Sequence, residues 1–467
     1  MKRYACPAAL ILVFASIVPA FAHGAAASGD IPESAVRERV RAIESLGRSR
    51  DEAALRSFIE ADLTARLASS LDERELMSML RTIGEAAAGA GDITISQTGG
   101  GLLLSLRGAR DLDVHFALEQ AEPHRIDALS IDTEVSGPGR DGEAAIAPIT
   151  WDDLATRLRE EEAAGFSGVV LVVRDGHVVL DEGYGMADAG RGIPNTTGTI
   201  FCIGSTAIDF TKAAVLLLMD EGKLDLSDRV SRFFPEAPAD RGAITIEQLM
   251  TGRSGLPNFH HDPAVDDDYD LTWIDRDEAV RRIFAAPLLF APGEGQAHSH
   301  SAFVLLAAVV EIASGALYEE FVRSRFLEPI GLEHTGFYGP DSRLDPAMMA
   351  VGYGPSSVGE PNIPANWGPT SWLVMGSGGM VSNPGDMYRW VRAIHSGDHL
   401  SGRALDVYGR GNVLAGGSDR GFLFVYIDDP LNTVLVSSNA HDRAGPVARA
   451  LVQLVVSSGD GKEKESE

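Results

Sequence analysis

The spacing of hydrophobic positions divides the first part of the chain into two kinds of secondary structure. Between residues 33 and 90, apolar positions recur every three or four residues, as at Leu76, Leu80 and Ile83, which predicts amphipathic helices. Between residues 92 and 118 the spacing falls to two, which predicts short strands. Helices followed by antiparallel strands indicate a small α+β domain, which we place at residues 30–134.

A second, larger domain follows a predicted linker. Residues 135–148 are rich in Gly, Pro and Ala, and residues 149–456 then mix helical and strand-like patterns of the α/β (α+β) class. Asp175-Gly176 lies between two apolar runs and predicts a β-hairpin. Residues 205–221 are apolar almost all round and end at Gly222, which predicts a buried helix. Further predicted helices cover residues 276–286, 301–314, 317–327, 384–395 and 444–456, followed by a charged tail at residues 457–467.

The N-terminus has the pattern of an export signal. Lys2 and Arg3 precede an apolar run, and Ala20-Phe21-Ala22 fits a cleavage site between small residues. The run is short for a membrane span, which needs about 20 residues. We therefore expect residues 1–22 to be a signal peptide and the mature protein, without a membrane span, to be periplasmic or extracellular.

Composition narrows the expected partners. The chain has 467 residues with 67 acidic and 40 basic side chains, and its formal charge of −27 would repel a phosphate backbone. Nucleic acid is therefore not an expected partner, whereas a small-molecule or peptide ligand is. Cys6 and Cys202 are the only cysteines, too few for a disulfide framework or a cysteine-based metal cluster, and we predict no cofactor.

Nine stretches between residues 149 and 456 occur in the order found in one large enzyme family. They are GYGMADAGRGIP at 183–194, FCIGS at 201–205, LMDEGKLDLSDRVSRFFPE at 218–236, ITIEQLMTGRSGLP at 244–257, APGE at 291–294, LLAAVVEIASGALYEEFV at 305–322, EPIGLEHTGFY at 328–338, GSGGMVSNPGDM at 376–387 and GFLFVYIDDPLNTVLVSSN at 421–439. Together they resemble the serine β-lactamase and penicillin-binding-protein superfamily, in the class C-like branch with D-alanyl-D-alanine carboxypeptidases and esterases. The resemblance implies a β-lactamase/transpeptidase-like fold, and the segment 30–134 is loosely similar to the cystatin-like or NTF2-like domains that precede some serine hydrolases.

The resemblance implies a Ser-x-x-Lys motif at the start of the buried helix, and here the motif has changed. Ser205 is retained, but Ile208 occupies the lysine position. A serine hydroxyl needs a neighbouring base to become a nucleophile. Lys212 lies two turns beyond Ser205, about 10 Å along a helix, so we do not expect it to replace the missing lysine.

Two further family motifs are also altered. The Tyr-x-Asn motif is replaced by His298-Ser299-His300, and the Lys-Thr-Gly motif by Ala415-Gly416-Gly417. By resemblance, His300, Gly416 and Gly417 would line the substrate cleft. The backbone amides of Ser205 and Ser418 would form an oxyanion hole, which does not depend on the neighbouring side chains.

Three functions remain open from the sequence. The favoured one is a catalytically impaired relative, a pseudoenzyme, that binds a peptide or acyl ligand, such as a fragment of the cell wall, in the retained cleft. The second is an active ester or amide hydrolase with Ser205 as nucleophile and His298 as general base, because a neutral imidazole is the usual partner of a catalytic serine. The third is a metal site formed by His298, His300 and the loop at 260–262, although we assign no residue as a metal ligand. For Ser205 itself, an ordinary helix N-cap is the alternative to a nucleophile.

Overall fold

The computed structural model describes most of the chain, in segments separated by short gaps. The described residues are 32–48, 52–68, 73–98, 101–108, 112–119, 122–132, 146–257, 272–295, 297–339, 343–353, 360–408, 413–428 and 432–459. The predicted signal peptide at 1–22, most of the linker and most of the charged tail lie outside these residues, and so does the loop at 260–262.

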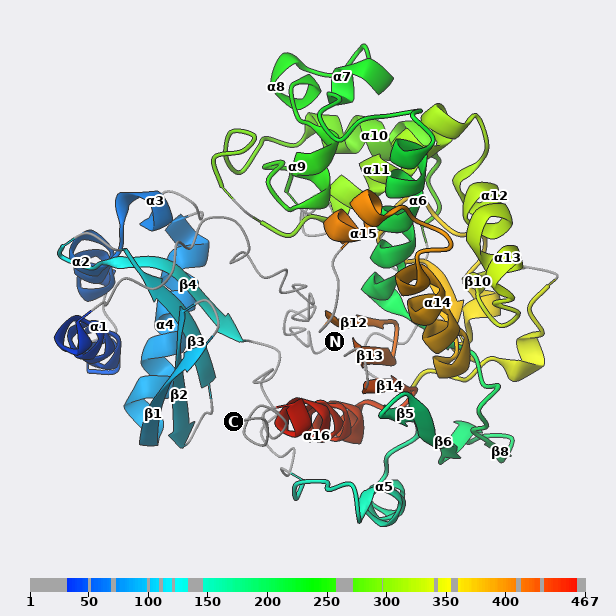
Figure 1. The fold of residues 1–467 in the computed structure, drawn as a ribbon, viewed down its shortest axis with the longest axis horizontal. Coiled ribbons are helices and arrows are strands. Elements are labelled where there is room, and N and C mark those ends of the chain that lie inside the picture. The colour runs from blue at the N-terminus through cyan, green and yellow to red at the C-terminus, as the bar shows by residue number, and fades with distance from the viewer. Residues whose placement is uncertain are drawn as a thin grey trace, which may run out of the picture.

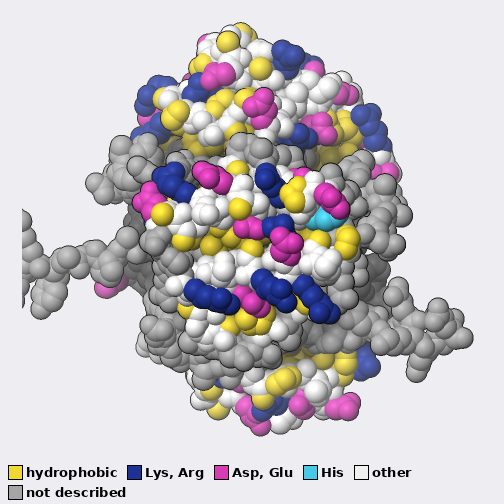
Figure 2. Space-filling view, turned by 90° about the vertical axis from the view of Figure 1, so that its left-hand side faces the viewer, with side chains coloured by type: hydrophobic (Ala, Val, Ile, Leu, Met, Phe, Trp, Pro, Cys, Tyr) yellow, Lys and Arg dark blue, Asp and Glu magenta, His cyan; other side chains and the backbone are white. Residues whose placement is uncertain are grey.

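The N-terminal unit consists of helices followed by a four-stranded antiparallel sheet, in the order predicted. Its helices are α1 (Glu33–Ser45), α2 (Glu52–Asp62), α3 (Ala65–Ala68) and α4 (Glu73–Gly89), and its strands are β1 (Ala90–Thr98), β2 (Gly101–Gly108), β3 (Leu112–Leu118) and β4 (Ile126–Asp132). The strands pair in sequence order. Apolar residues of α4, including Leu80 and Ile83, pack with Leu104 and Val114 of the sheet in a separate hydrophobic core. Figure 2 views this side of the molecule, where basic and acidic side chains are interspersed with apolar ones.

A five-stranded antiparallel sheet lies at the centre of the larger unit. Its strand order is β12-β13-β14-β5-β6, formed by β5 (Gly168–Arg174), β6 (His177–Tyr184), β12 (Val413–Asp419), β13 (Phe422–Asp428) and β14 (Thr433–Ser438). The predicted hairpin is confirmed, because Asp175 and Gly176 connect β5 to β6 with φ angles of 50° and 77°. Strand β12, which comes late in the chain, forms one edge of the sheet.

Helices cover both faces of this sheet (Figure 1). Helices α5 (Leu154–Ala163) and α16 (His441–Gly459) pack on one face, and α14 (Pro384–Ser396) packs on the other. The remaining helices are α6 (Ile208–Asp220), α7 (Val230–Phe233), α8 (Ala239–Gly242), α9 (Ile246–Met250), α10 (Arg276–Ala285), α11 (His300–Ser314), α12 (Tyr318–Val322), α13 (Glu328–Ile330) and α15 (Gly402–Tyr408). Short strands complete the unit: β7 (Met186–Asp188), β8 (Ile193–Pro194), β9 (Phe201–Cys202), β10 (Gly336–Phe337) and β11 (Met380–Ser382).

Helix α6 is the buried helix that the sequence predicts. It packs against α11, α12 and α15, and Phe210 stacks on Trp390 of α14 with the ring centroids 4.0 Å apart. Its end is the predicted glycine C-cap: Gly222 has a φ of 70°, and the Lys223 amide donates to the Leu218 carbonyl. Among the described residues, no single helix is long and apolar enough to cross a membrane; only the bent pair His300–Ser314 and Tyr318–Ile330 meets that test by length and composition.

Candidate active site

Ser205 lies in a tight turn that leads into α6. Strand β9 is followed by Gly204, whose φ of 50° suits glycine, and residues Gly204–Ala207 form a 3₁₀ turn before the α-helix. The N-cap positions of the turn and of α6 are Ile203 and Ala207, so Ser205 occupies neither. Its hydroxyl instead forms a hydrogen bond with Nε2 of His300 at 3.2 Å.

His300 is held in place because it is the first residue of α11. Ser299 is the N-cap of this helix, and its hydroxyl accepts a hydrogen bond from the Ala302 amide at 3.2 Å. The Ser301 hydroxyl donates to the Pro257 carbonyl at 2.7 Å and ties the helix start to the preceding loop. These contacts fix the position from which the His300 ring reaches Ser205.

His298 packs against His300. The ring centroids are 4.9 Å apart with an interplanar angle of 86°, an edge-to-face arrangement. The Nε2 atom of His298 is buried without a hydrogen-bond partner among the residues that the structure describes. Burial lowers the pKa of His298 to about 4, and the positive charge of Lys212 contributes in the same direction. His298 is therefore uncharged near neutral pH.

The placement of the two histidines differs from the roles that the sequence assigned to them. The sequence assigned His298 as the base and His300 as a binding residue, whereas the hydrogen bond to Ser205 comes from His300. Residues 298 and 300 share a face in an extended chain, so the sequence placed both in the cleft. Which ring reaches the serine depends on where α11 begins, and that boundary is set by tertiary contacts.

Two charged residues of α6, which the sequence did not assign to the site, lie further along the helix. Asp209 is 8% exposed and accepts a hydrogen bond from the Tyr426 hydroxyl of β13. The Lys212 ammonium lies 3.9 Å from the Asp209 carboxylate and 5.9 Å from the centre of the Phe303 ring. The available signal was their helical spacing, because residues three or four apart share a helix face, as Ile208 and Lys212 do.

The remaining predicted positions lie in the hydrophobic core and on strand β12. Ile208 is 5% exposed and belongs to the main hydrophobic core. Strand β12 packs against the Ser205 turn, with Gly416, Gly417 and Ser418 opposite Val425, Phe424 and Leu423 of β13. Because β12 is an edge strand, part of its backbone is not paired within the sheet. The oxyanion role of Ser205 and Ser418 stays a prediction.

A metal site finds no support within the described part of the chain. No group of three or more His, Cys, Asp or Glu residues there is placed to hold a metal ion. The loop at 260–262, which the metal hypothesis needs, lies outside the described residues. Cys202 is buried in β9.

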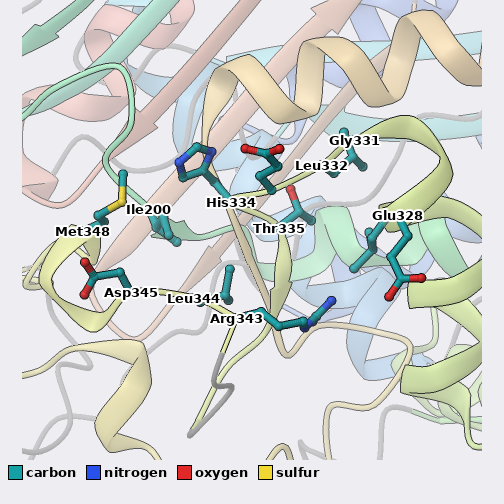
Figure 3. A pocket seen from close by; sticks show the side chains of 12 residues that line it. Ile200, Glu328, Gly331, Leu332, His334, Thr335, Arg343, Leu344, Asp345 and Met348 are labelled. Carbon is teal, nitrogen blue, oxygen red and sulfur yellow. The ribbon is translucent and has the colours of Figure 1, made fainter.

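A separate cavity of about 570 Å³ lies beside α13 and β10 (Figure 3). Its lining combines charged residues with apolar ones: Ile200, Leu327, Glu328, Gly331, Leu332, Glu333, His334, Thr335, Arg343, Leu344, Asp345 and Met348. Ser205 and the histidine pair are not among them. Because acidic, basic and apolar side chains are mixed, the lining indicates no single class of ligand.

Comparisons with known proteins identify the family. The sequence model of the Beta-lactamase family matches residues 152–434, more than half of the chain, and the chain belongs to this family. Esterase EstB of Burkholderia gladioli is 29% identical over 317 residues, which cover 58% of this chain and 78% of EstB. The D-alanyl-D-alanine-carboxypeptidase/endopeptidase AmpH of Escherichia coli (strain K12) is 29% identical over 269 residues, which cover 54% of this chain and 66% of AmpH.

A solved structure shows the same fold. The octameric penicillin-binding protein homologue from Pyrococcus abyssi has a TM-score of 0.56 and 23% identity, covering 66% of this chain and 78% of the homologue. The expected superfamily and its β-lactamase/transpeptidase-like fold are confirmed. The chain is thus a member of a serine hydrolase family whose relatives include proteins named as esterases and carboxypeptidases.

Proposed function

We propose that this protein is an acyl hydrolase in which Ser205 attacks an ester or amide carbonyl and His300 accepts the serine proton. The observation that carries the proposal is the 3.2 Å hydrogen bond between the Ser205 hydroxyl and Nε2 of His300. A serine and a base within hydrogen-bond reach are the minimal pair for nucleophilic catalysis. The sequence favoured an impaired enzyme because Ile208 replaces the lysine, and this contact supplies a base from another element.

The proposed reaction follows the usual course of serine acyl transfer. For His300 to accept the proton at Nε2, its ring must be neutral and carry its proton on Nδ1. Attack of the Ser205 oxygen on the carbonyl gives a tetrahedral oxyanion, which the backbone amides of Ser205 and Ser418 would stabilise. His300 then returns the proton to the leaving alcohol or amine, and water releases the acyl group in a second step with the same base.

Relatives support the proposed substrate class. EstB is named an esterase and AmpH a D-alanyl-D-alanine-carboxypeptidase/endopeptidase, and a D-amino acid amidase from Ochrobactrum anthropi shares the fold. A small ester or a peptide derived from the cell wall is therefore the proposed substrate. Export fits this choice, and we propose that residues 1–22 direct the protein to the periplasm or outside the cell.

The second candidate is a binding protein without turnover. Ile208 is buried at the position of the family's lysine, so proton transfer of the usual kind is lost. In that case Ser205 would contact a bound carbonyl or carboxylate without becoming acylated.

The deciding experiment is acylation of Ser205. The mature protein is incubated with p-nitrophenyl acetate, and the acyl adduct and nitrophenol release are followed by mass spectrometry and absorbance. We expect Ser205→Ala to form no adduct and His300→Gln to lower the acylation rate by about 10³-fold, since removing a general base typically costs 10³–10⁶. The matched variant His298→Gln should lose less than His300→Gln. If the wild type acylates no faster than Ser205→Ala, the binding protein is the better description.

A further inference from the structure

A chain of side-chain contacts connects Ser205 to Lys212 of α6. Ser205 contacts His300, and the His300 ring contacts the ring of His298. One further contact connects these rings to Lys212, because Phe303 of α11 lies 6.3 Å from the His298 ring and 5.9 Å from the Lys212 ammonium. The family lysine at position 208 is missing, but a cation is present one helical turn further on, on the same face of the helix.

Resting on the proposed hydrolase function, we propose that Lys212 is a positioning residue that controls the protonation of the histidine pair. Its charge keeps the pair neutral, so that His300 can accept the Ser205 proton over a wider range of pH. Lys212 acts through His298 and does not touch the reacting atoms.

The charges around the pair support this arrangement. Lys212 and Asp209 lie on the same helix, α6, with the Asp209 carboxylate 3.9 Å from the ammonium. Tyr426 of β13 donates its hydroxyl proton to Oδ2 of Asp209, whereas the Lys212 ammonium lies nearer to Oδ1. At 3.9 Å the ammonium and the carboxylate are beyond direct hydrogen-bond distance, and the positive charge of Lys212 lowers the pKa of His298 in addition to the larger effect of burial.

The proposal predicts opposite effects for two substitutions. Lys212→Met removes the cation but keeps a long, flexible side chain, so protonation of the pair becomes easier. The acid limb of the pH–rate profile should move up by about half to one pH unit. Asp209→Asn removes the anion and leaves Lys212 without a counter-charge, so the limb should move down by a smaller amount.

Two controls separate charge from structure. Lys212→Arg keeps the positive charge and should leave the limb within about 0.2 pH unit of the wild type. Lys223→Met removes an equivalent charge from an exposed lysine that pairs with Glu221, and it should not move the limb. If Lys212→Met does not fold, the opposite shift in Asp209→Asn and the unchanged profile of Lys212→Arg still decide the proposal.

An NMR titration makes the test independent of catalysis. Histidine labelled with ¹³C at Cε1 is titrated in each variant, and His298→Gln and His300→Gln assign the two resonances. We expect both resonances to titrate at higher pH in Lys212→Met and at lower pH in Asp209→Asn. Equal titration curves in wild type and Lys212→Met overturn the proposal even if the ester is hydrolysed. Shifted curves without hydrolysis support Lys212 while rejecting the proposed hydrolase.

Discussion

Two clusters of buried polar groups on α6 differ in how they are satisfied. In the first, around Thr211, the Thr211 hydroxyl donates to the Gly376 carbonyl at 2.6 Å and accepts from the Tyr318 hydroxyl at 2.5 Å. Thr211 and Tyr318 are almost completely buried, and the Thr211 hydroxyl both donates and accepts a hydrogen bond. In the second, around His298, the buried Nε2 atom has no partner among the described residues, and the positive charge of Lys212 acts on the ring.

This difference indicates that the Thr211 cluster serves stability and that the His298 cluster serves chemistry. A buried polar group without a partner costs about 1–3 kcal/mol, so proteins rarely keep one without a use. The satisfied cluster of Thr211 fixes α6 against the 376 turn and α12. The open cluster keeps the Nε2 atom of His298 without a partner beside His300, which contacts Ser205. Substitutions in the two clusters should therefore separate effects on stability from effects on activity.

The largest effect is expected when the family's lysine is restored at Ile208, beside the open cluster of His298. Ile208 is 5% exposed, and Ile208→Lys would bury an ammonium near Lys212, which already carries a positive charge. We expect the free energy of unfolding to fall by about 2–4 kcal/mol and activity to gain little. Urea denaturation and the p-nitrophenyl acetate assay measure both quantities.

A triple variant tests whether the surroundings cause that loss. Adding His298→Tyr and His300→Asn restores the family pattern, and part of the stability should return because residues in one network are not additive. A neutral effect of Ile208→Lys on stability, together with fast ester hydrolysis, would show that the histidines already suit a lysine. The site around Ser205 and the two histidines would then be a hydrolase site that lacks only its usual base.

Local signals in the sequence predicted the scaffold, and long-range packing decided the site. Asp175-Gly176 and Gly222 were predicted correctly because a hairpin turn and a helix C-cap depend on adjacent residues. The terminal helix is longer than predicted: it starts at His441, although Pro446 lies inside it. The contact between Ser205 and His300 joins residues 95 positions apart, and no local pattern shows which of two neighbouring imidazoles will form it.

An intermediate effect is expected for a substitution in the satisfied cluster of Thr211. Thr211→Val removes a hydroxyl without changing the shape of the side chain, and it leaves the Tyr318 hydroxyl and the Gly376 carbonyl buried without this partner. We expect a loss of about 2 kcal/mol in the free energy of unfolding, with ester hydrolysis per folded molecule within about twofold of the wild type. Combining it with Tyr318→Phe should cost less than the sum of the two single variants. Loss of activity without loss of stability would reverse the roles assigned to the Thr211 and His298 clusters.

The smallest effect concerns the pH dependence of stability. Burial lowers the pKa of His298 from 6.5 to about 4, so in this interval the unfolded chain binds a proton that the folded protein does not. Stability therefore falls as the pH decreases from about 6.5 to 4, because protons favour the unfolded state. Since the ring is only partly shielded from water, we expect this residue to account for about 1–2 kcal/mol of the decrease.

Removing the imidazole should remove this share of the pH dependence. Urea denaturation at pH 7 and pH 4.5 should show a smaller loss of stability for His298→Gln than for the wild type. His177→Gln, at an exposed position of β6, is the matched control and should keep the wild-type dependence. Equal dependence in all three proteins would mean that His298 is as readily protonated in the folded protein as in the unfolded chain. His298 would then be an ordinary solvated histidine. The contrast with the Thr211 cluster would rest on Asp209 and Lys212 alone.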